Sequence, residues 1–198
     1  MVNFSVNPRL ASLLGENYRS TEQALKELVD NAWDADAENV WIKIPDPEIF
    51  SNEPIIIQDD GCGMTEKEIS KEYLHIASGK FSRTGERTPK KNRLVKGRKG
   101  IGKFAGLMIA NIMQIETKAR GVLVKLTIPK QTLLETDIDL EKIELPIQSS
   151  KCNPDEHGTT ITLSNLNQNL AFPNSERLRQ ILVLEYGRET DFNIYVND

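Results

Sequence analysis

The sequence predicts a two-layer α/β domain in which helices cover one face of a mixed, largely antiparallel sheet. Two observations lead to this fold class. Amphipathic and β-rich runs alternate in the order helix, strand, strand, helix, loop, helix, strand, strand, and then strand, helix, strand. The 198 residues also fit one hydrophobic core, which favours a single layered domain.

The first predicted helix covers residues 20–35. Ser20 followed three residues later by Gln23 is the pattern of a capping box, and apolar residues then recur at helical spacing. Two β-rich runs come next, at 40–44 and 54–58. We expect these two runs to be neighbouring strands.

Thr65 caps a second predicted helix, after which the chain enters a glycine-containing, basic loop. A run of apolar and small residues that begins at Lys103 predicts a buried helix. The predicted elements after the first two strands are helices at 65–76 and 103–110, strands at 113–119, 122–128 and 159–163, a helix at 176–184, and a strand at 192–196.

Composition excludes several classes of protein. Hydrophobic residues make up 38% of the chain and form regular runs, which excludes disorder throughout. No stretch approaches the roughly 20 apolar residues of a membrane span, and the N-terminus lacks the pattern of a signal peptide. We therefore expect a soluble, cytoplasmic protein without a membrane partner. Cys62 and Cys152 lack the spacing of a zinc site or a disulfide framework, so both are expected to be ordinary thiols.

The charge is unevenly distributed. The net charge is −4, yet the segment from Lys80 to Lys103 contains ten Lys or Arg residues and one acid, Glu86. Such a run is either a solvated loop or a surface for an anionic partner, including nucleic acid. Apart from Phe81 and Phe104 the segment lacks interleaved aromatic residues, which weakens the case for stacking on single strands.

One face of the first helix carries three polar side chains. At about 100° per residue, Glu27, Asn31 and Asp34 fall within about 60° of one another. A solvated polar stripe is one interpretation of this face. An amide oxygen beside carboxylates is also a set of hard ligands that suits Mg²⁺.

Two glycine motifs follow. Asp59–Met64 reads Asp-Asp-Gly-Cys-Gly-Met directly after an apolar strand, where two glycines allow a sharp turn or the close approach of a flat ligand. Gly97–Gly102 has the spacing Gly-x-x-Gly-x-Gly before a predicted helix, which favours phosphate binding. The second motif is neither a dinucleotide fingerprint nor a P-loop.

In combination these motifs resemble the Bergerat-fold, or GHKL, ATPases. This group contains type II topoisomerase ATPase subunits, ninety-kilodalton heat-shock chaperones, histidine-kinase catalytic domains and MutL. The resemblance covers about residues 20–165. Its four boxes match residues 27–35, 59–64, 97–102 and 158–161.

The resemblance implies a role for each matching residue. Glu27 would be the general base that polarises the attacking water, Asn31 the Mg²⁺ ligand, and Asp59 the acceptor for the adenine amine. Asp34 would lie near the sugar or the metal, or would be a structural helix carboxylate. The remaining implied ATP contacts are Gly61 and Gly63 beside the adenine, Met64 below it, Gly97, Gly100, Ile101, Gly102 and Lys103 at the phosphates, and Thr159, which would steady Asp59 and the adenine.

The resemblance also implies a domain plan. Residues 1–165 would form the ATP-binding domain, with residues 77–99 as its lid, while 166–198 would either complete that domain or begin a truncated following one. Whether Ser78 and Lys80 contact nucleotide is left open. His75 and His157 are expected to be structural, because neither has a partner at a spacing typical of metal or triad chemistry.

Within the group, Glu27 favours the hydrolase branch, since histidine kinases do not need this base. The residues around Trp33 resemble MORC-type and MutL-type ATPases, with the chaperones a little further away. The expected function is Mg²⁺-dependent ATP hydrolysis by the N-terminal module of a larger ATP-gated machine. That machine would dimerise with ATP and act on a protein or nucleic-acid client, while the isolated chain would be a monomer. The alternatives are a nucleic-acid-binding domain that uses the segment 80–103 and an ATP-binding scaffold without hydrolysis.

Overall fold

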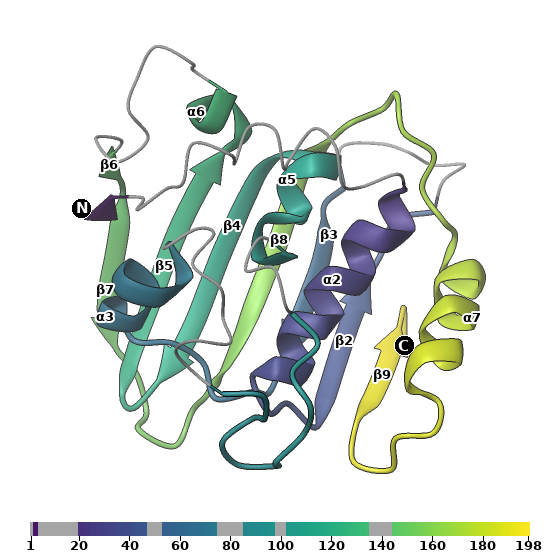
Figure 1. Cartoon of the computed structure of the whole chain (residues 1–198). Helices are drawn as coiled ribbons and strands as arrows, with labels where there is room; N and C mark the ends of the chain where they lie inside the picture. The colour runs from purple at the N-terminus through teal and green to yellow at the C-terminus, as the bar shows by residue number, and fades with distance from the viewer. Residues whose placement is uncertain (1, 4–19, 47–52, 75–84, 98–101, 135–143) are drawn as a thin grey trace.

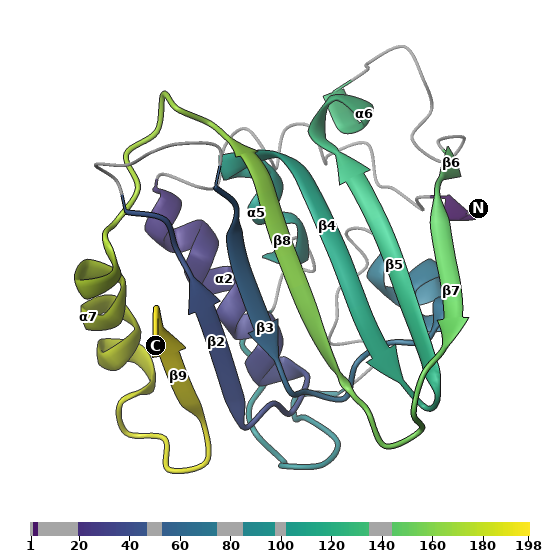
Figure 2. The same ribbon diagram turned by 180° about the vertical axis from the view of Figure 1, so that it is seen from behind.

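The computed structural model describes residues 2–3, 20–46, 53–74, 85–97, 102–134 and 144–198. These residues form a seven-stranded sheet with helices packed on one face, and the other face is open in the reverse view (Figures 1 and 2). Every pairing in this sheet is antiparallel except the parallel pair at one edge, between β2 and β9. The predicted fold class is confirmed.

The order of strands across the sheet is β7-β5-β4-β8-β3-β2-β9. Their bounds are β2 Asn39–Lys43, β3 Ile55–Asp59, β4 Ala110–Ala119, β5 Val122–Pro129, β7 Ile147–Lys151, β8 Gly158–Leu166 and β9 Asn193–Val196. A separate short pair joins β1, Val2–Asn3, to β6, Glu144–Leu145.

The described α-helices are α2 Thr21–Asp34, α3 Glu66–Glu68, α5 Gly106–Ile109, α6 Lys130–Leu134 and α7 Ser175–Tyr186. A π-helical turn, Ile69–Tyr73, continues α3, and a 3₁₀ turn, Gly102–Phe104, precedes α5. None of these helices combines the length and the apolar composition that a membrane crossing requires.

The core lies between α2 and the inner face of the sheet. Residues alternate between buried and more exposed along β2, as a sheet with one covered face requires. The side of α2 that faces the sheet contributes six buried apolar residues: Ala24, Leu25, Leu28, Val29, Ala32 and Trp33. Their helical spacing is the pattern that predicted this helix.

The helix caps agree only in part with the sequence pattern. Ser20 Oγ accepts a hydrogen bond from the N–H of Gln23 at 3.1 Å, but the Gln23 side chain bonds Glu27 at 3.4 Å and does not close a capping box. A complete capping box occurs instead at Thr65. The Glu68 N–H donates to the Thr65 hydroxyl oxygen, and the Glu68 carboxylate accepts the Thr65 N–H.

Two predicted helices differ from the structure. The described part of the helix at 65–76 changes from α to π geometry after Glu68. In the helix predicted at 103–110, the chain makes a 3₁₀ turn and a four-residue helix and already enters β4 at Ala110. Gly106 explains the close fit of this helix, because a Cβ there would lie 2.5 Å from a methyl group of Leu163 on the sheet.

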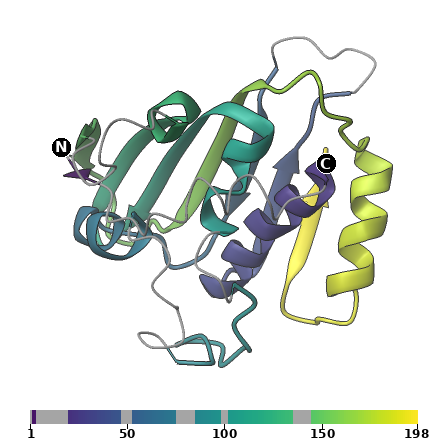
Figure 3. The ribbon, with the colours of Figure 1, turned by 45° about the horizontal axis from the view of Figure 1, so that its top comes forward.

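The C-terminal helix α7 packs beside α2 next to the sheet edge formed by β9 (Figure 3). The Tyr186 hydroxyl donates to Oδ1 of Asp30, which is only 4% exposed, and Lys26 bonds Oδ2 of the same carboxylate at 2.9 Å. Since a buried carboxylate must be paired, this cluster fixes the position of α7 against α2.

Replacing Tyr186 with phenylalanine should destabilise the fold. The substitution keeps the ring but removes one donor from a buried carboxylate, which typically costs about 1–3 kcal/mol. Urea unfolding would measure the loss. The matched control is Tyr195→Phe, because Tyr195 is 37% exposed and its ring stacks on Trp41 in a way that phenylalanine would preserve. Equal stabilities of the two variants would contradict the role of the Tyr186 hydroxyl.

Candidate active site

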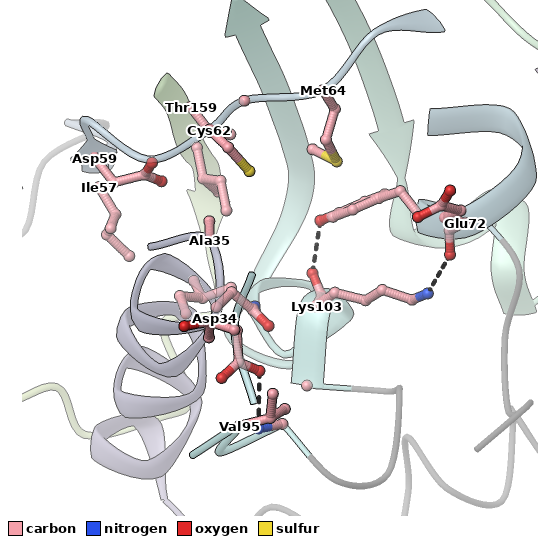
Figure 4. Close-up of a pocket in the computed structure, with 18 of the residues that line it drawn as sticks. Asp34, Ala35, Ile57, Asp59, Cys62, Met64, Glu72, Val95, Lys103 and Thr159 are labelled. Atoms are coloured by element: carbon pink, nitrogen blue, oxygen red, sulfur yellow. Dashed lines mark hydrogen bonds between the residues drawn. The ribbon is translucent and has the colours of Figure 1, made fainter. Parts of the chain in front are cut away.

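A cavity of about 350 Å³ lies between the C-terminal half of α2 and the adjoining ends of β3 and β8 (Figure 4). Nine residues singled out from the sequence line it: Asn31, Asp34, Asp59, Gly63, Met64, Gly97, Gly102, Lys103 and Thr159. Gly61 and Glu27 adjoin this lining through contacts with Asp59 and Gly102. The predicted contacts Gly100 and Ile101, together with His75, Ser78 and Lys80, lie outside the described residues.

Asp59 ends β3, in the interior of the sheet between β2 and β8. Its Oδ1 accepts the N–H of Gly61 at 2.8 Å. Burial raises the pKa of Asp59 to about 7, although hydrogen bonds from the backbone of Gly61 and Thr159 oppose the shift. The cavity therefore contains a carboxyl group that titrates near neutral pH.

The neighbouring Asp60 has a structural role. Its carboxylate accepts the N–H groups of Glu38 and Asn39 at 2.7 and 2.9 Å, and the Asn39 side chain at 2.7 Å. Burial alone would raise the pKa of Asp60, but the hydrogen bonds from Asn39 and Glu38 outweigh it and hold the pKa below its usual range. Two adjacent aspartates thus have opposite electrostatic environments.

A buried hydroxyl on β4 connects two of the predicted contacts and was missed in the sequence. Thr117 is fully buried, and its Oγ1 accepts the N–H of Met64 at 2.9 Å, donates to the carbonyl of Gly158 at 3.1 Å and lies 3.1 Å from Oγ1 of Thr159. The sequence offered one signal for it: Thr117 is the polar residue in the alternating row of β4 that faces the core and is otherwise apolar. Thr117 therefore fixes both the turn at Met64 and the Thr159 hydroxyl.

Asn31 and Glu27 lie one helical turn apart on α2. Among the described residues Asn31 Nδ2 is buried without a hydrogen-bond partner, which is uncommon for an amide nitrogen and leaves a donor for an acceptor such as a phosphate oxygen. Glu27 packs so closely against Gly102 that a Cβ there would collide with Glu27 Oε2. The described residues contain no cluster of three His, Cys, Asp or Glu residues able to hold a metal. The donor set therefore fits Mg²⁺ that takes one amide oxygen from the protein and its other ligands from water and phosphate.

Asp34 binds the basic segment. Its two carboxylate oxygens accept the N–H groups of Lys96 at 2.8 Å and Gly97 at 3.0 Å. Asp36, two residues further on and beyond the end of α2, has a φ of 60° and accepts the N–H groups of Lys90 and Lys91. These bonds to the basic segment are structural, and Asp34 also lines the cavity, so both of its predicted roles stay predictions.

Lys103 and His157 make contacts within the protein. Lys103 Nζ donates to the carbonyl of Glu72 at 2.9 Å, and the Lys103 carbonyl accepts the Tyr73 hydroxyl at 2.9 Å (Figure 4). A ring nitrogen of His157 lies 3.0 Å from the carbonyl of Gly61. The π-helical turn thus positions Lys103 at the cavity, and His157 braces the glycine turn after Asp59.

Comparison with known proteins agrees with this geometry. A family described as "Histidine kinase-, DNA gyrase B-, and HSP90-like ATPase" matches residues 18–159. The chain belongs to this ATPase family. The resemblance seen in the four sequence boxes is thereby confirmed.

The curated relatives of this ATPase-family chain include a restriction enzyme and chaperones. A putative type II restriction enzyme, HgiDII from Herpetosiphon aurantiacus, is 37% identical over 61% of the chain and 18% of its own length. The chaperone protein HtpG of Pasteurella multocida is 26% identical over 89% of the chain and 29% of its own length. HtpG of Borreliella burgdorferi is 22% identical over 96% of the chain and 32% of its own length. The chain thus spans less than a third of each of these relatives.

Gly63 is the glycine of the second box with the strictest requirement. Its φ is +60°, and a Cβ would collide with the carbonyl oxygen of Lys118 on β4. Only glycine avoids both the left-handed strain and this collision. The turn can therefore bring Met64 against the cavity while its N–H reaches Thr117.

Gly63→Ala should destabilise the ATPase-family domain more than Gly85→Ala. Gly85 also has a positive φ, +78°, but a Cβ there meets nothing within 4 Å, so this control isolates the strain of the backbone conformation. The collision at Gly63 should add about 1–3 kcal/mol, the usual cost of overpacking. Parallel thermal and urea unfolding would measure the difference, and equal losses would show that the backbone at Gly63 yields easily.

Proposed function

We propose that this chain binds ATP together with Mg²⁺ in the cavity and hydrolyses it to ADP and phosphate. Membership of the ATPase family supports the general activity. The observation that carries the proposal is that one cavity is lined both by the carboxyl group of Asp59, whose pKa is raised, and by Asn31, whose buried amide nitrogen has no hydrogen-bond partner among the described residues. An adenine amine would donate to the carboxylate, and a phosphate oxygen would accept from the amide N–H, while the amide oxygen of the same side chain is the proposed Mg²⁺ ligand.

The Asp59 end of the cavity suits adenine. Ionised Asp59 accepts a hydrogen bond from the exocyclic amine, whereas guanine presents an oxygen at the same edge and would be repelled. Gly61 and Gly63 leave room for the flat base, and Met64 supplies an apolar surface on which it lies. Thr159, held by Thr117, provides a hydroxyl beside Asp59.

The Glu27 end suits the triphosphate. Glu27 orients a water molecule and takes its proton as the water attacks the γ-phosphate. Asn31 offers its amide oxygen as the metal ligand, and bound Mg²⁺ supplies positive charge that offsets the charge of the phosphate oxygens. Lys103 and the backbone of Gly97 and Gly102 line the same region, and the proposal extends this phosphate contact to Gly100 and Ile101.

The whole protein is proposed to be an ATP-gated machine of which this chain is the ATPase module. The small share of each relative that the chain spans supports a larger protein. In the proposal residues 77–99 act as the lid, ATP drives self-dimerisation of the full-length protein, and the isolated chain is a monomer. Pairing of β9 with β2 supports the view that 166–198 complete the ATP-binding domain.

Direct nucleic-acid binding by the basic segment is the weaker candidate. Within its described part, Lys91 and Lys96 form ion pairs with Glu38 and Glu185, and Arg93 is only 6% exposed. Cationic side chains that already pair with carboxylates of the same protein contribute little to binding the phosphates of a nucleic acid.

Glu27→Gln should retain ATP binding and lose most hydrolysis. The amide keeps the shape of the side chain but cannot take a proton from water, and removal of a positioned base typically costs about 10²–10⁴ in rate. Phosphate release and calorimetric affinity would be measured on the same preparation. Glu22→Gln is the control, because Glu22 lies on the same helix and makes a surface ion pair with Arg177.

Two outcomes would contradict these roles. Phosphate release close to that of the parent would remove Glu27 from catalysis. A parent chain that binds ATP tightly but releases no phosphate would favour the scaffold without hydrolysis.

The ionisation of Asp59 should respond to nucleotide. In the unliganded protein its pKa is about 7, and because the adenine amine donates to the ionised form, ATP should lower that pKa and release a proton at pH 6–7. Carboxyl-carbon NMR titration would follow Asp59, with Asp60 as an internal control that titrates low with and without ATP. An Asp59 signal that titrates identically in both states would refute its contact with the base.

A further inference from the structure

Part of the basic segment, residues 85–97, forms one wall of the cavity. Five of its residues line the cavity: Arg87, Thr88, Pro89, Val95 and Gly97. The segment folds back on itself: the Thr88 N–H donates to the Arg93 carbonyl, the Arg93 N–H donates to the Thr88 hydroxyl oxygen, and Arg87 forms an isolated antiparallel bridge with Leu94. The shape of the cavity therefore depends on what holds this short loop in place.

Arg93 attaches the wall to the rest of the protein. Its guanidinium donates to the carbonyl of Ala37 and to the carbonyl of Asp191, both at 2.6 Å, and pairs with the Asp191 carboxylate at 2.9 Å. The guanidinium carbon also lies 4.4 Å from the centre of the Trp33 ring and 5.3 Å from that of Phe192. The planar guanidinium stacks on rings and donates hydrogen bonds in several directions at once, and a lysine ammonium group cannot reproduce this combination.

Lys96 makes the second attachment. Its Nζ bonds Oε1 of Glu185 on α7 at 3.0 Å and lies 4.1 Å from the centre of the Tyr186 ring. Between the two cations, the Trp33 indole N–H donates to the carbonyl of Leu94 at 3.0 Å. Neither Arg93 nor Lys96 lines the cavity.

We propose that Arg93 and Lys96 are positioning residues of the nucleotide site, through which α7 and the loop at 191–192 hold the cavity wall. The inference rests on the proposed function. The acidic partners, Glu185 and Asp191, lie beyond the region that matches the ATPase family, which ends at residue 159. Because coupling between two parts of a protein is reciprocal, nucleotide should also stabilise α7 against the domain.

The test compares Arg93→Ala, Arg93→Lys and Lys96→Ala with the parent. Arg93→Ala should raise Kd for a non-hydrolysable ATP analogue and KM for ATP by about tenfold, toward the lower end of the usual range for coupled sites, with kcat nearly unchanged. Arg93→Lys should recover only part of the affinity. Lys90→Ala is the matched control, because it removes one cation from the same loop while keeping the backbone N–H that bonds Asp36.

Hydrogen exchange separates positioning from simple stability. In the parent, the analogue should slow exchange both at 85–97 and in α7, and Lys96→Ala, which removes the bond to Glu185, should abolish the effect in α7. If Arg93→Ala does not fold, Lys96→Ala and Glu185→Ala carry the test in a double-mutant cycle, since both side chains are partly exposed. Their effects on Kd should be less than additive.

The outcomes are distinct. A parent that binds no nucleotide overturns the proposed function and this inference with it. A parent that binds nucleotide, with variants that match it in Kd, KM and exchange of α7, overturns this inference alone. Additive effects of Lys96→Ala and Glu185→Ala on Kd would likewise remove Lys96 from the positioning role.

Discussion

The packing of α2 across the inner face of the sheet is the constraint on which the rest of the structure depends. The apolar side of the helix is buried in the core, and this contact leaves it little freedom to rotate or slide. The orientation of the helix then fixes where Glu27, Asn31 and Asp34 lie. A rotation by one residue position, about 100°, would carry all three away from the cavity.

The local partners of each charged group, more than the overall charge distribution, decide its ionisation and its contacts in this protein. Asp59 and Asp60 are neighbours, yet loss of solvent around its carboxyl group raises the pKa of Asp59 to about 7, while several hydrogen-bond donors keep the pKa of Asp60 below its usual range. The basic segment, which its composition suggests as a surface for phosphate, places Arg93 against two aromatic rings, Trp33 and Phe192, that also contact each other. Net charge over a window therefore gives little information on which cations remain accessible to a partner.

Much of the fold and of the cavity could be predicted from the sequence because the responsible patterns are local. The helical spacing within α2, the paired β-rich runs of β2 and β3, and the glycines around Asp59 are all visible within short windows. The edge strand β7 was not, since it is mostly polar and exposed and shows no alternation. The contact of Lys96 with Glu185 joins residues 89 positions apart, and no local pattern can predict such a pairing.

The parallel pairing of β9 with β2 has a consequence for the edge of the sheet. β9 covers hydrogen-bonding groups of β2, and Phe192 beside it covers the indole of Trp33 at a ring distance of 5.2 Å. A protein shortened to the four family boxes would lose this cover and expose a strand edge next to a large apolar ring. Uncovered strand edges are templates for pairing with other chains, so a domain that lacks the last thirty or so residues should aggregate more readily than one in which the short strand β9 forms the edge.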